Sequence, residues 1–116
     1  MKPILDKDKA KIAAGIATAN TIRDAFAGYA QSQNDNLFPP ATSITDWSTL
    51  TTICNANGAK LRNAEQDQGL VFVRYNDMGD QTDYLLILAV KGVPADLTGS
   101  QIEIHSSGII KETLGS

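Results

Sequence analysis

The sequence has few of the residues that most enzymes and metal sites use. Its 116 residues include one cysteine, Cys54, and one histidine, His105. A single cysteine excludes a disulfide within these residues. A structural zinc site needs four ligands, and the sequence contains no CxxC or HxxxH spacing. The nucleophilic arrangement that remains is Cys54 with His105 as its base.

Local sequence argues against that pair. Cys54 follows Trp47 and Leu50 at helical spacing, so it lies on the apolar face of a predicted helix, where a thiol is usually buried and inert. His105 ends an alternating segment that places it on the exposed side, beside Glu103. We therefore expect no catalytic residues, no cofactor and no enzymatic activity.

Positive charge and long apolar runs are also scarce. Ten Lys and Arg residues against thirteen Asp and Glu residues give a net charge of −3. Nucleic-acid binding requires a basic excess, so we expect no nucleic-acid partner. The longest apolar run, residues 84–90, has the length of a strand, whereas a membrane-spanning helix needs about 20 apolar residues. No signal peptide is visible at the start of the sequence.

Alanine, in contrast, is concentrated at one end of the chain. Eight alanines lie in the first thirty positions, and no proline interrupts residues 6–33. These residues are predicted to form one helix of about 40 Å, long for so small a domain. One arc of about 140° carries its apolar side chains. They are Ile12, Ile16, Ala19, Ile22, Phe26, Tyr29 and Ala30. Arg23 falls inside this arc, and we expect it to reach the sheet edge or pair with a carboxylate.

The opposite face of this helix is small and nearly uncharged. Its residues are Ala13, Ala14, Ala17, Thr21, Ala25 and Gly28. A solvated helix face usually carries Lys and Glu, and small side chains let another backbone approach closely. These residues are therefore a candidate assembly interface. The alternative is that alanine is simply tolerated on an exposed helix.

The remaining residues predict a short helix and a sheet. Turn formers and two prolines in residues 31–40 end the first helix, and Asp46 caps a second one over residues 46–57. Strand-like runs at 70–75, 84–90, 101–105 and 109–113 place a sheet over residues 69–113. The predicted fold is α+β, a single domain over 1–116. Its long N-terminal α-helix packs on a small three- to four-stranded antiparallel sheet, with a short second helix.

The predicted hairpin loop at 76–83 is rich in acidic residues. Asp77, Asp80 and Asp83 place three carboxylates close to Gly79. Oxygen ligands on a loop suit calcium, so these aspartates are a candidate calcium site. Their spacing is not that of an EF-hand, and Asp, Asn and Gly are also what an ordinary exposed hairpin prefers.

The order of these elements resembles the type IV pilin and type II secretion pseudopilin family. The similarity lies in Pro3 and the charged residues around it, the helix over 8–29, and the Asn-Leu-Phe-Pro exit at 36–39. Residues 84–90, 102–105 and 108–110 resemble the family's hairpin sheet and its ending. The resemblance implies a structural subunit that assembles through its N-terminal helix into a pilus or pseudopilus. Its implied partners are other pilin or pseudopilin subunits and the inner-membrane assembly machinery, and several pseudopilins bind calcium in their sheet loops.

The sequence departs from the family at both ends. The prepilin cleavage site and apolar segment are missing, which fits a soluble piece truncated just before Pro3. The membrane would then be contacted only through that absent segment. The expected location is the inner membrane with a periplasmic domain, or an extracellular fibre. The missing C-terminal disulfide loop favours a pseudopilin, a minor pilin or a lineage without the disulfide. A free-standing α+β ligand-binding or regulatory module is the alternative.

Overall fold

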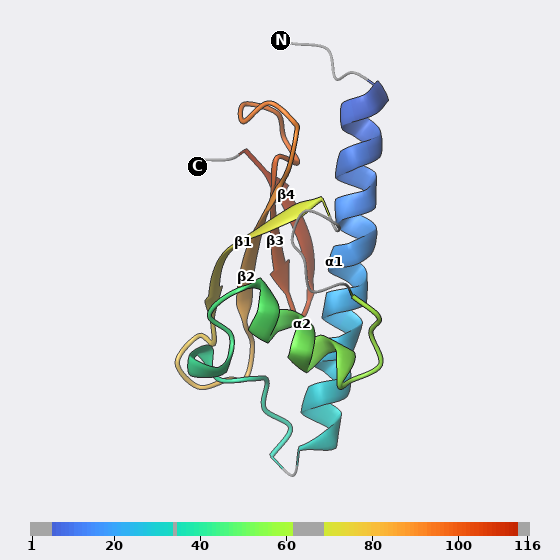
Figure 1. Ribbon diagram of the computed structural model, residues 1–116. Helices are drawn as coiled ribbons and strands as arrows, with labels where there is room; N and C mark the ends of the chain where they lie inside the picture. Colours follow the sequence, from blue (N-terminus) through green and yellow to red (C-terminus); the bar gives the residue numbers. More distant parts are fainter. Residues whose placement is uncertain (1–5, 34, 62–68, 114–116) are drawn as a thin grey trace.

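The predicted α+β arrangement is present in the computed structural model, which describes residues 6–33, 35–61 and 69–113. A long helix runs along one side of a four-stranded antiparallel sheet, and a short helix packs beside it (Figure 1). The elements are α1 (Asp6–Ser32), the 3₁₀ helix η1 (Ala41–Ser43), α2 (Trp47–Asn55), β1 (Leu70–Asn76), β2 (Leu85–Val90), β3 (Gln101–His105) and β4 (Gly108–Glu112).

Helix α1 buries the apolar arc that its sequence predicts. Ile22, Phe26 and Ala19 are fully buried against the sheet, and the acidic residues Asp6 and Asp8 occupy the first turn, where they suit the helix dipole. The arc also contains the buried residue Gly15, which the pattern of apolar side chains does not identify. A Cβ at Gly15 would lie 3.2–3.3 Å from side chains of Ile102, Leu70 and Val90, so glycine permits close approach of helix and sheet.

Helix α2 begins with the predicted cap. The Asp46 side chain accepts a hydrogen bond from the backbone N–H of Thr49, and the Thr49 hydroxyl accepts one in return from the Asp46 backbone N–H. This reciprocal capping box satisfies two groups that the start of a helix otherwise leaves free. Trp47, Leu50 and Cys54 point into the core, as their spacing predicts.

The sheet is a simple meander in the order β1-β2-β3-β4. Its register pairs Leu86 with Tyr75 on β1 and with Ile104 on β3, and these three side chains face the core. A bulge between Phe72 and Arg74 adds one residue to β1 and leaves Val73 47% exposed.

Aromatic rings hold the lower part of α1 to the sheet. Phe26 meets Tyr84 edge-on at a ring separation of 4.7 Å and Tyr75 at 5.7 Å. Phe38 lies in the segment that follows α1, and its ring packs edge-on against the ring of Tyr84 at a ring separation of 4.9 Å. The Tyr75 hydroxyl donates a 2.7 Å hydrogen bond to the carbonyl of Pro39, which ties the exit segment to β1.

Candidate functional site

The outer face of α1 is the largest of the predicted sites. Ala13, Ala14, Ala17 and Thr21 are exposed, and we call them the small-residue face. Thr21 donates its hydroxyl to the Ala17 carbonyl at 3.2 Å, so its polar group is satisfied within the helix. These four residues lie together along the upper and middle turns of α1 and present no charge.

Two members of the predicted interface lie elsewhere. Ala25 is only 3% exposed and belongs to the core, so its assignment to an outer interface is wrong. The reason is that α2 packs on this flank of α1. Gly28 is half-buried, and a Cβ there would lie 3.5 Å from the Asn57 carbonyl, just beyond the end of α2. Small residues at these two positions therefore serve packing inside the domain.

A groove adjoins the small-residue face. It has a volume of about 340 Å³ and lies between the first half of α1 and the Thr98 and Lys111 side chains. Ile12, Ala13 and Ile16 supply apolar lining, and Lys9 and Lys111 add positive charge. The groove can accept an apolar side chain beside an acidic one.

The three aspartates of the hairpin loop do not converge. Asp77 accepts hydrogen bonds of 2.9 Å from the backbone N–H groups of Ala41 and Gly79, and these bonds hold its pKa below the usual value. The bond to Ala41 fastens the loop to η1. Asp80 instead accepts from Thr82, through the hydroxyl at 2.7 Å and the backbone N–H at 3.1 Å, which likewise lowers its pKa.

Asp83 has a third set of partners. It accepts hydrogen bonds from the backbone N–H groups of Tyr84 at 2.7 Å and Ser106 at 3.0 Å. Desolvation acts to raise its pKa, but these bonds, together with the Ser106 side chain and the charge of His105, outweigh it and the pKa stays below the usual value. Among the residues that the structure describes, no group of three or more His, Cys, Asp or Glu side chains is placed to hold a metal ion. Calcium binding by Asp77, Asp80 and Asp83 stays a prediction.

Cys54 and His105 are also apart. Cys54 is fully buried in the core, and burial raises the pKa of its thiol to about 12. A thiol with that pKa is a poor nucleophile at neutral pH. His105 ends β3 and lies on the other face of the sheet from its neighbour Ile104, which faces the core. Over residues 6–33, 35–61 and 69–113, burial alone is what shifts the pKa of the Cys54 thiol, and no titratable partner of the thiol is found.

The buried thiol and phenols predict alkaline destabilisation. Burial raises the pKa of Cys54 to about 12 and lifts the pKa values of Tyr75 and Tyr84 well above their usual range. The unfolded chain loses these protons from about pH 9 upward while the folded chain keeps them. Stability is therefore intact below pH 9 and falls above it, by about 1.4 kcal/mol per pH unit for each titrating group.

Urea unfolding at about pH 7, 9 and 10.5 measures this loss. Cys54→Ala is the matched variant, since it removes the group that titrates first and should delay the onset by about one pH unit. A free energy of unfolding that stays constant from pH 7 to pH 10.5 contradicts the burial of all three groups.

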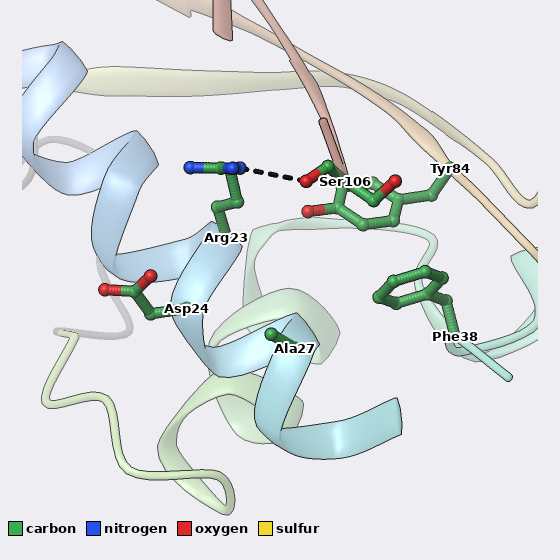
Figure 2. Close-up of a pocket in the computed structure, with 6 residues that line it drawn as sticks. All are labelled: Arg23, Asp24, Ala27, Phe38, Tyr84 and Ser106. Carbon is green, nitrogen blue, oxygen red and sulfur yellow. Dashed lines mark hydrogen bonds between the residues drawn. The ribbon is translucent and has the colours of Figure 1, made fainter. Parts of the chain in front are cut away.

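A second cavity lies where α1 passes the β3–β4 turn. It has a volume of about 120 Å³ and is lined by Arg23, Asp24, Ala27, Phe38, Tyr84 and Ser106 (Figure 2). Arg23 donates from Nε to the carbonyl oxygen of Ser106 at 3.2 Å, so it reaches the sheet edge as its place in the apolar arc predicts. Arg23 can be identified from the sequence through this place in the arc. Tyr84 cannot be identified from the sequence as part of a polar site, because it belongs to an apolar run.

No protein-family model, curated protein or solved structure matches this chain. No helix in the described part of the chain is long and apolar enough to span a membrane.

Proposed function

We propose that this chain is the globular part of a structural subunit of a type IV pilus or type II secretion pseudopilus, and that it assembles through α1. The observation that carries the proposal is the small-residue face: Ala13, Ala14, Ala17 and Thr21 leave this side of α1 exposed, uncharged and free of bulky side chains over residues 13–21, and Asp24 is the charge that follows it. A neighbouring helix or domain can approach such a surface closely, at little cost of desolvating charge.

The dimensions of the domain support this proposal. Its longest extent is 48 Å, and α1 runs along the length of the sheet (Figure 1). A helix placed along the long axis can contact several neighbours at successive levels of a fibre. The groove beside Ala13 adds an apolar recess to the same region. The proposed partners of this chain are other pilin or pseudopilin subunits and the inner-membrane assembly machinery. We propose that α1 continues into an apolar membrane segment.

Substitution of the small-residue face tests the proposal. Ala17→Arg, made in the full-length gene product, places a long charged side chain at the centre of this face. We expect filament mass to fall at least tenfold, because the charge must be desolvated on assembly. The folded domain should lose less than about 0.5 kcal/mol of stability, because Ala17 is exposed. Electron microscopy of sheared filaments and thermal unfolding of the domain measure the two effects.

Ala95→Arg is the matched control, because Ala95 is also exposed but lies in the loop before β3. Filaments of normal yield from Ala17→Arg, or a full-length protein found only in the cytosol, contradict the proposal. The resemblance also predicts that the gene encodes a short leader ending in glycine, followed by about 20 apolar residues, immediately before Lys2.

A free-standing ligand-binding or regulatory module is the second candidate function. The cavity beside Arg23 supports it, because a recess with a charged side chain and aromatic walls is typical of small-ligand sites. Such a module needs no apolar leader segment and no filament, so the location of the full-length protein separates the two candidates.

A further inference from the structure

The cavity beside Arg23 is rich in hydrogen-bond donors. Its volume of about 120 Å³ is roughly four times the volume of one water molecule in the liquid. Phe38 and Ala27 contribute apolar surface, while Arg23 and Tyr84 contribute N–H and O–H groups. Among the described residues that line the cavity, Asp24 has the one acidic side chain, and it is exposed.

Arg23 keeps most of its hydrogen-bonding capacity. A guanidinium carries five N–H donors, and within the described residues Arg23 uses Nε alone, toward the Ser106 carbonyl. It forms no ion pair with the residues that the structure describes. The Asp24 side chain leaves the helix in a different direction (Figure 2), because adjacent helical residues point about 100° apart. Arg23 therefore brings to the cavity lining a positive charge that no ion pair within the described residues neutralises.

Tyr84 has an unused hydroxyl. Its side chain is fully buried, and the hydroxyl has no hydrogen-bond partner in the described part of the chain. Figure 2 shows the hydroxyl end of its ring pointing toward the Arg23 side of the cavity, with Phe38 at the opposite side. Burying a hydroxyl without a partner costs free energy, so an acceptor in the cavity stabilises the folded protein.

We propose that this cavity binds one carboxylate group. The terminal N–H groups of Arg23 match the two oxygens of a carboxylate, and the Tyr84 hydroxyl donates a further hydrogen bond to it. The carbon next to the carboxylate contacts Phe38 and Ala27. The cavity volume holds a carboxylate with one or two carbons attached. Such a group belongs either to a small free acid or to an aspartate or glutamate side chain of a second copy of this chain.

The proposal is independent of the fibre proposal, because none of the cavity residues belongs to the small-residue face. Loss of filaments in Ala17→Arg leaves carboxylate binding intact, and loss of carboxylate binding in an Arg23 variant leaves the small-residue face intact. The two proposals therefore fail separately.

Titration of the domain with sodium acetate, followed by two-dimensional ¹H–¹⁵N NMR, tests the site. We expect saturable shifts at Arg23 Nε and at the backbone amides of Ala27 and Ser106. Sodium chloride at the same ionic strength should produce no saturable shift at these groups. This comparison uses the unaltered protein, so it does not depend on any variant folding. Equal responses to acetate and chloride overturn the proposal.

Substitutions at Arg23 and Tyr84 test which side chains donate hydrogen bonds to the bound carboxylate. Arg23→Gln should weaken acetate binding at least tenfold, since it removes both the charge and the paired N–H groups. Tyr84→Phe removes one hydroxyl and should weaken binding about threefold to tenfold. Lys7→Gln is the matched control, because it removes one positive charge from an exposed position of α1 outside the cavity lining, and it should bind acetate as well as the parent. Undiminished binding in a folded Arg23→Gln domain overturns the proposal.

Analytical ultracentrifugation separates the two sources of the carboxylate. If a second copy supplies it, the domain self-associates, and both acetate and Arg23→Gln weaken that association. If a free acid is the ligand, acetate binds without changing the sedimentation of the domain. Either result, together with saturable acetate shifts, supports the site.

Discussion

Phe26→Ala is expected to lower the free energy of unfolding by about 4 kcal/mol, because removing a fully buried ring leaves a cavity as well as lost apolar contact. Phe26 is 0% exposed and contacts the rings of Tyr75 and Tyr84 edge-on. A domain of this size has a total stability of about 5–15 kcal/mol, so one substitution removes a large share of it. Urea unfolding followed by circular dichroism measures the loss.

Phe26→Leu is the matched control. Leucine keeps most of the buried volume and loses the edge-on ring contacts, so we expect a loss of about 1.5 kcal/mol. If Phe26→Ala and Phe26→Leu both lower the free energy of unfolding by less than about 1 kcal/mol, Phe26 does not pack between α1 and the sheet in solution.

Gly15→Leu is expected to cost about 3 kcal/mol, through overpacking. Three side chains from the sheet already lie 3.2–3.3 Å from where a Cβ would stand, so the further carbons of leucine must displace them. The helix must move away from the sheet or the neighbouring side chains must leave their preferred rotamers. The gain in helix propensity over glycine, about 1 kcal/mol, offsets only part of this cost.

The adjacent position provides the control for Gly15. Ala14 is exposed, so Ala14→Leu should change the stability of the isolated domain by less than about 0.5 kcal/mol. Thermal unfolding of the two variants side by side measures the difference. If Gly15→Leu is as stable as Ala14→Leu, the close contact between α1 and the sheet does not exist in solution.

Much of this fold could be predicted from the sequence because its signals are local. The apolar arc of α1 follows helical periodicity, and the helix ends where prolines cannot continue it. Asp46 and Thr49 form a cap within one turn of chain, and residues 84–90 form β2 from Leu85 onward. Each of these features depends on residues close together in the sequence.

The features that were missed depend on contacts between distant segments. Periodicity identifies the buried face of α1, but it does not say which flank α2 covers, so it predicts an exposed Ala25 where the structure buries it. Gly15 is a small residue whose role appears only when the sheet lies against it. The cavity beside Arg23 needs Phe38, Tyr84 and Ser106 to meet, and these residues come from three separate segments.

The strand order has a consequence for folding kinetics. Each strand pairs with the next in the sequence, so the sheet can form through short-range chain closures. Two side-chain hydrogen bonds that hold α1 to the segments around the sheet span far more chain: 81 residues from Lys11 to Gly92 and 83 from Arg23 to Ser106. We infer that the meander forms first and that α1 docks late. Interactions absent from the transition state act mainly on the unfolding rate, so the docking of α1 sets how long the folded domain persists.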